Sequence, residues 1–102
     1  MQALAIDARR GAEMSIAWSV NSVAAVTAAK GDYERAATLN GLAAAMLKRA
    51  GGEWPPDERE QYDQTLATVS EGLPPEVLAT VHARGAAMSL TDGVAYALRA
   101  AD

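Results

Sequence analysis

Four carboxylates that lie close together in the sequence are the first candidates for chemistry, because such groups can bind a hard cation or act as an acid–base pair. The four residues are Asp57, Glu58, Glu60 and Asp63. An acid–base pair needs two carboxylates that converge on one pocket, whereas Glu58 and Glu60 stand two residues apart and point to different faces of one helix. A solvated helix face, with acidic residues near the helix start, explains the cluster more simply.

The other reactive residue types are isolated from one another. His82 is the one histidine and there is no cysteine, so no second soft ligand can join it in a zinc site. Ser89 stands three residues before Asp92, a spacing typical of a helix cap, and no base at a specific spacing accompanies it. Gly51-Gly52 lacks the Lys-Ser/Thr that completes a phosphate-binding loop. We therefore predict no catalytic, cofactor-binding or metal-binding residues, and we expect that the protein is not an enzyme.

Length and charge narrow the class of protein further. The chain has 102 residues and a net charge of −4, which fits one domain over 1–102 with an acidic surface. Modules that bind nucleic acid normally present a concentrated basic face, so we expect no direct nucleic-acid partner. Charges at Asp7, Arg9 and Arg10 interrupt any export signal, and the longest uncharged run, 14–29, is shorter than the about 20 residues of a membrane span. We predict a cytoplasmic protein with no membrane segment.

Apolar residues at helical spacing predict helices along the whole chain, and no alternating run predicts a strand. The expected helices are an opening segment that ends at Arg10 before Gly11, then 12–30, 33–50, 56–70, a short helix from Pro75 to about Arg84, and a last helix capped by Ser89. Gly31 is expected to adopt a positive φ and Asp32 to cap the helix that follows. We predict an all-α fold of five or six helices in antiparallel hairpins, in which abundant alanine permits close helix approach. The last helix is expected to turn Leu90, Val94, Ala97 and Leu98 inward.

The helix expected over 12–30 has an apolar arc that is too wide for one neighbour. One stripe of this arc would meet a preceding hairpin in a helical stack, and it stays open where no such hairpin exists. Trp54 stands before a Pro-Pro pair, where it can pack over a helix end or anchor a partner. The candidate interaction residues are Ile16, Trp18, Val20, Val23 and Trp54.

Residues Gly31-Asp32-Tyr33-Glu34-Arg35-Ala36 resemble the turn and second-helix start of a tetratricopeptide repeat laid over 17–50. Thr27, Asn40 and Lys48 depart from that repeat, which usually has an aromatic, a large apolar residue and a proline there. The same turn, followed by Trp54-Pro55-Pro56-Asp57-Glu58-Arg59 and Met88-Ser89-Leu90-Thr91-Asp92-Gly93-Val94, resembles the C-terminal helical segment of actinobacterial-type regulators. These are LuxR-type transcriptional regulators and adenylate-cyclase-like proteins with an ATPase domain. The resemblance implies that 1–102 is a C-terminal fragment, or a stand-alone remnant, of such a bacterial regulator.

The resemblance implies a non-enzymatic module that acts by packing. In this hypothesis the helices transmit a signal through contacts with a protein partner or with other domains of the parent regulator, and isolated copies pair as a homodimer. An alternative from another class is a domain that senses a small-molecule effector in a groove lined by Met46, Trp54 or Tyr62. A third hypothesis, direct binding of DNA by the last two helices, is disfavoured by the acidic charge.

Overall fold

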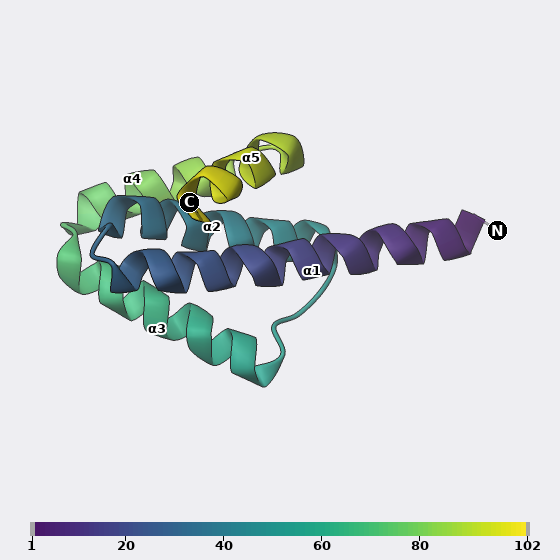
Figure 1. Ribbon diagram of the computed structural model, residues 1–102, viewed down its shortest axis with the longest axis horizontal. Coiled ribbons are helices and arrows are strands. Elements are labelled where there is room, and N and C mark those ends of the chain that lie inside the picture. Colours follow the sequence, from purple (N-terminus) through teal and green to yellow (C-terminus); the bar gives the residue numbers. More distant parts are fainter. Residues whose placement is uncertain (1, 102) are drawn as a thin grey trace.

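The computed structural model describes residues 2–101, with side chains from residue 12 onward, and contains five α-helices. They are α1 (Gln2–Ala29), α2 (Tyr33–Arg49), α3 (Pro56–Gly72), α4 (Pro75–Ala86) and α5 (Leu90–Ala101). Helices α1 and α2 pack as an antiparallel pair, and α4 packs along α2 (Figure 1). No strand occurs within 2–101. The prediction of an all-α fold is confirmed, with five helices.

The first helix differs from the prediction. We expected a helix end at Arg10 and Gly11, but α1 continues without a break from Gln2 to Ala29. A glycine inside a helix costs only about 1 kcal/mol relative to alanine, so it does not stop a helix whose neighbours favour one. The first turns of α1 therefore project beyond the other four helices instead of belonging to a separate hairpin (Figure 1).

The turns after α1 and α2 are built in the same way. Gly31 adopts a φ of 87° and Gly51 a φ of 72°, in the left-handed region that favours glycine. In each turn the glycine N–H and the following N–H donate to the last carbonyls of the helix, as in a Schellman motif. Asp32 then accepts a hydrogen bond from the backbone N–H of Arg35 at 3.4 Å and caps α2. The predictions for Gly31 and Asp32 are confirmed.

Helix α2 is the centre of the fold, because it contacts each of the other four helices. Leu39 and Leu42 of α2 are fully buried in the main core, which α1, α2 and α5 form together. A second core lies toward α3 and α4, around Val69 and Val81. The bundle thus surrounds one helix on several sides, and ten consecutive or near-consecutive residues of α2 are buried as a result.

Glycines bring α2 and α4 into backbone contact. A Cβ atom on Gly41 would overlap the carbonyl group of His82, and a Cβ atom on Gly85 would overlap the carbonyl group of Thr38. Only a residue without a side chain fits at either position. The close helix approach that we expected from the alanine content is therefore made by glycines at the α2–α4 crossing.

Arg49 links the end of α2 to the turn between α4 and α5. Its guanidinium donates to the carbonyl oxygen of Ala86 at 2.6 Å and to that of Met88 at 2.9 Å. Ala86 is the last residue of α4 and Met88 lies in the turn after it, so neither carbonyl has an intrahelical partner. One residue further on, Ser89 caps α5 as predicted, because its Oγ accepts from the N–H of Asp92 at 3.1 Å.

Candidate functional site

The clearest hollow on the surface lies between α1 and α5, and we call it the α1–α5 groove. Its volume is about 270 Å³. Apart from two serines, the residues that line it are apolar. They are Ser15, Ile16, Ser19, Val20, Val23, Val94, Ala97, Leu98 and Ala101. Leu98 is 64% exposed, which is the largest exposure of a large hydrophobic residue among the described side chains. A large apolar side chain beside an apolar hollow is typical of a contact surface.

A second hollow of about 210 Å³ extends the groove toward the end of α1. The two hollows share Val23 and Ala101, and the second is also lined by Val26 and Lys30. Val26 is 54% exposed. Two of the three exposed large hydrophobics of the described residues, Val26 and Leu98, therefore border two neighbouring hollows.

The outward face of α1 carries no charge over most of its length. From Met14 to Ala29 the sequence contains no ionisable residue. The exposed positions in this stretch are Ser15, Ser19, Ser22, Val26 and Ala29. On α3, by contrast, the exposed positions include four acidic residues and an arginine. Since a helix face in water is normally rich in charged residues, the small and uncharged face of α1 is better suited to contact with another surface.

The five predicted interaction residues do not lie together. Ile16, Val20 and Val23 line the α1–α5 groove, although α5 covers Val20 and leaves it only 3% exposed. Trp18 packs against the main core. Trp54 stacks on Tyr62, with ring centroids 5.4 Å apart. The stripe thus belongs to the groove, whereas neither tryptophan lines it.

Helix α5 forms the second wall of the groove, and we did not predict this wall from the sequence. We expected Leu90 and Leu98 to face inward, but both are exposed. The residues that α5 turns toward the interior are the small ones Gly93, Ala97 and Ala100. Their spacing of four and three residues marks the buried face, and Leu98 lies outside it. The spacing of these small residues in the sequence could have indicated the buried face. The prediction instead relied on the large apolar residues Leu90 and Leu98.

The reactive groups noted in the sequence have separate structural roles, and the first of them involves a buried amide. Asn40 is fully buried, its Nδ2 donates to the backbone oxygen of Tyr62 at 3.3 Å, and its Oδ1 lies 3.0 Å from His82 Nε2. Because the carbonyl of Tyr62 can only accept, the amide orientation of Asn40 is fixed, and Nε2 of His82 must carry the hydrogen. His82 therefore joins α4 to α2 and α3 structurally.

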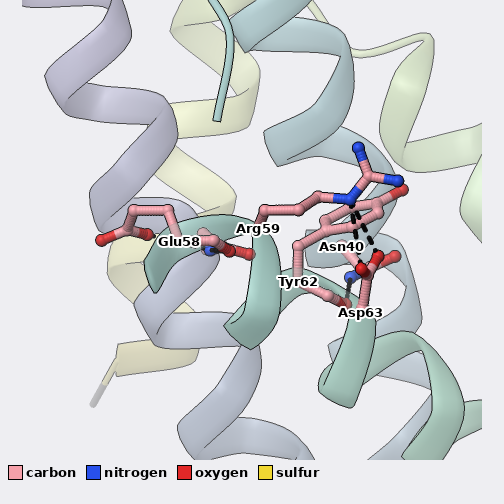
Figure 2. A network of polar contacts seen from close by, with 6 residues as sticks. Asn40, Glu58, Arg59, Tyr62 and Asp63 are labelled. Atoms are coloured by element: carbon pink, nitrogen blue, oxygen red, sulfur yellow. Dashed lines mark hydrogen bonds and ion pairs between the residues drawn. The ribbon is translucent and has the colours of Figure 1, made fainter. Parts of the chain in front are cut away.

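The acidic residues at the start of α3 point in two different directions. Figure 2 shows Glu58 turned toward α1 and away from the pair formed by Arg59 and Asp63. Glu58 accepts a hydrogen bond from Asn21 Nδ2 at 2.9 Å, while Arg59 Nε donates to both carboxylate oxygens of Asp63 at 3.1 Å. No group of His, Cys, Asp and Glu side chains that could hold a metal ion occurs from residue 12 to 101. The cluster stabilises helix contacts, and its carboxylates do not converge on one pocket.

Burial shifts the pKa values of two groups in this region. It raises the pKa of Tyr62, and the nearby Arg59 opposes that shift. It lowers the pKa of His82 below its usual value. Tyr62 lies near Arg59 and Asp63, which pair with each other, whereas burial alone accounts for the pKa shift of His82.

The pKa shift of His82 predicts that the protein loses stability in mild acid. The neutral form is favoured in the folded state, so the contribution of His82 is complete above the unfolded pKa of about 6.5 and is lost as the pH falls toward the lower folded pKa. We expect the free energy of unfolding, measured by urea denaturation, to fall between about pH 7.5 and pH 5.5. His82→Gln keeps a donor for Asn40 but cannot be protonated, so it should reduce this fall. An equal fall in both proteins would contradict the assignment.

Comparisons with models of protein families, with curated proteins and with solved structures found no match to this chain. None of the described helices combines the length and the apolar character that crossing a membrane requires.

Proposed function

We propose that this chain is a non-enzymatic helical module that contacts another protein surface through the α1–α5 groove and the outward face of α1. The observation that carries the proposal is the position of Val26 and Leu98, which are exposed beside two neighbouring, mainly apolar hollows. A second observation supports it, because α1 lacks ionisable residues from Met14 to Ala29. Burial of such a surface is favourable, at roughly 25 cal/mol per Å² of apolar area.

The resemblance to bacterial regulators adds a role to this surface. In our proposal α1 and α2 form one tetratricopeptide-like hairpin, and the chain is the C-terminal helical segment of a cytoplasmic transcriptional or signalling regulator. The groove would then receive another domain of that regulator, a separate protein partner, or a second copy of the chain. Docking in the groove would transmit a signal by packing, without chemistry at the contact.

A photo-crosslinking amino acid at Ser19 tests the proposal in the cell of origin. Ser19 is exposed and lines the groove, so we expect adducts of higher mass, which mass spectrometry can identify. The matched control places the same amino acid at Thr80, which is exposed on α4. We expect Leu98→Asp to reduce the adducts at Ser19 by about tenfold, because a charge in a desolvated contact is costly. Similar adduct levels at Ser19 and Thr80, or none at Ser19, would exclude a contact role for this face.

Leu98 is a better position for this substitution than the residues of the original stripe. Val20 is buried against α5, so a charge there would disturb the core itself. Leu98 is mostly exposed, and Leu98→Asp should leave the free energy of unfolding within about 0.5 kcal/mol of the original value. A loss of adducts can then be assigned to the surface and not to unfolding.

A further inference from the structure

A different hollow, which we call the α2–α3 pocket, lies where α2 ends and α3 begins. Its volume is about 580 Å³, which falls within the range of about 300–1,000 Å³ that is common for small-molecule sites. The pocket combines apolar, aromatic and charged residues. They are Ala44, Leu47, Lys48, Gly51, Gly52, Glu53, Trp54 and Arg59. It shares no residue with the α1–α5 groove.

The aromatic side of the pocket is held in place from behind. The indole of Trp54 stacks on the ring of Tyr62 with an angle of 28° between the ring planes. The backbone of Tyr62 is bound in turn by the buried amide of Asn40. The loop before Trp54 is fixed by Gly51 at positive φ and by the hydrogen bond from Gly52 N–H to the carbonyl oxygen of Leu47 at 3.1 Å. Trp54 is therefore a positioned platform and not a loose surface side chain.

The charged side of the pocket is oriented as well. Arg59 donates through Nε to both oxygens of Asp63 at 3.1 Å, which sets the direction of the guanidinium (Figure 2). Within the described part of the chain the two terminal nitrogens of Arg59 make no hydrogen bond, so they can donate to a ligand. Lys48 supplies a second cation from the last turn of α2, and Glu53 supplies one negative charge. The lining has two positive charges and one negative charge, and Asp63, which pairs with Arg59 beside the pocket, offsets part of this positive excess.

We propose that the α2–α3 pocket binds a planar aromatic monocarboxylate. An aromatic ring fits against the anchored indole of Trp54, with Leu47 and Ala44 as further apolar contacts. The planar fork of Arg59 matches a carboxylate, and Lys48 adds a point charge. Glu53 disfavours a ligand with two negative charges, so a monoanion is preferred to a phosphate dianion. This site is independent of the contact surface in the groove and would make the module responsive to a metabolite of this class.

Three small probes separate the features of the site. Benzoate has both the ring and the charge, benzamide keeps the ring without the charge, and cyclohexanecarboxylate keeps the charge without the aromatic ring. We expect benzoate to shift the NMR signals of Trp54 and its neighbours saturably at concentrations up to about 50 mM, as a fragment of this size should. Each of the other two probes should bind at least about tenfold more weakly. Ionic strength and pH are kept constant throughout.

Matched variants locate the binding. Lys48→Met should weaken benzoate binding by about tenfold, whereas Lys30→Met, the same change at the far end of α1, should have no effect. Trp54→Leu should abolish the preference for benzoate over cyclohexanecarboxylate, and circular dichroism checks that this variant is folded. The proposal is overturned if benzoate does not saturate, if benzamide binds equally well, if the saturable shifts surround Trp18, or if the two lysine variants behave alike. The crosslinking at Ser19 does not depend on any of these outcomes.

Discussion

Gly85→Ala is expected to lower the free energy of unfolding by about 3 kcal/mol, the upper end of the usual range for overpacking. The added Cβ atom would overlap the carbonyl group of Thr38 and lie 3.0 Å from the backbone nitrogen of Leu42. Backbone atoms of a helix cannot rotate away as a side chain can, so α4 would have to move off α2. Urea denaturation of the variant, followed by circular dichroism, measures the loss.

Gly52→Ala is the matched control for this experiment. Its Cβ atom would also meet a neighbour closely, but that neighbour is the end of the flexible side chain of Met14. Met14 can adopt another rotamer, so we expect a loss of less than about 1 kcal/mol. Equal losses at Gly85 and Gly52 would show that the backbone contact between α2 and α4 is not as close as described.

Asn40→Leu is expected to destabilise the protein by a similar amount, about 3 kcal/mol, because leucine keeps the branched shape of asparagine but is larger and makes no hydrogen bond. The change leaves the Nε2–H of His82 without its partner and removes the additional hydrogen bond that the carbonyl oxygen of Tyr62 accepts besides its helical one. A buried polar group that loses its partner costs about 1–3 kcal/mol. A tetratricopeptide repeat usually has a large apolar residue such as leucine at this position. The variant therefore tests whether position 40 follows the pattern of the repeat or depends on the polar contacts of this chain.

A double-mutant cycle shows whether the polar contacts cause the loss. His82→Leu removes the donor that Asn40→Leu would strand, so the double variant should lose less stability than the sum of the two single variants. Gln64→Leu, at an exposed position of α3, should change the free energy of unfolding by less than about 0.5 kcal/mol. If Asn40→Leu is as neutral as Gln64→Leu, the buried network contributes nothing to stability.

Local signals in the sequence were sufficient for most helix boundaries. Gly31 and Asp32 act within a few residues of one another, and the Pro-Pro pairs set the starts of α3 and α4 in the same local way. The predicted helix end at Gly11 was wrong, because a glycine ends a helix only where the backbone also departs from helical φ and ψ angles. Nothing in the neighbouring sequence shows whether it does so.

The candidate sites depend on contacts between distant segments, and these were harder to predict. The α1 wall of the groove followed from the spacing of Ile16, Val20 and Val23, but the α5 wall did not, because Leu98 looks like a core residue until the packing of Ala97 and Ala100 is known. Of the residues that we expected to line an effector groove, only Trp54 lines the α2–α3 pocket, and Tyr62 stacks on it. Met46, which we had placed with them, borders a separate hollow beside Arg49 and Leu90.

The consecutive residues Lys48 and Arg49 at the end of α2 contact different parts of the molecule. Lys48 borders the α2–α3 pocket, and the guanidinium of Arg49 holds the carbonyls of Ala86 and Met88 just before α5 begins. A rotation of this single turn would displace the cation on one side and the anchor of α5 on the other. One helical turn thus contributes a charge to the lining of the pocket and also fixes the backbone from which α5 starts.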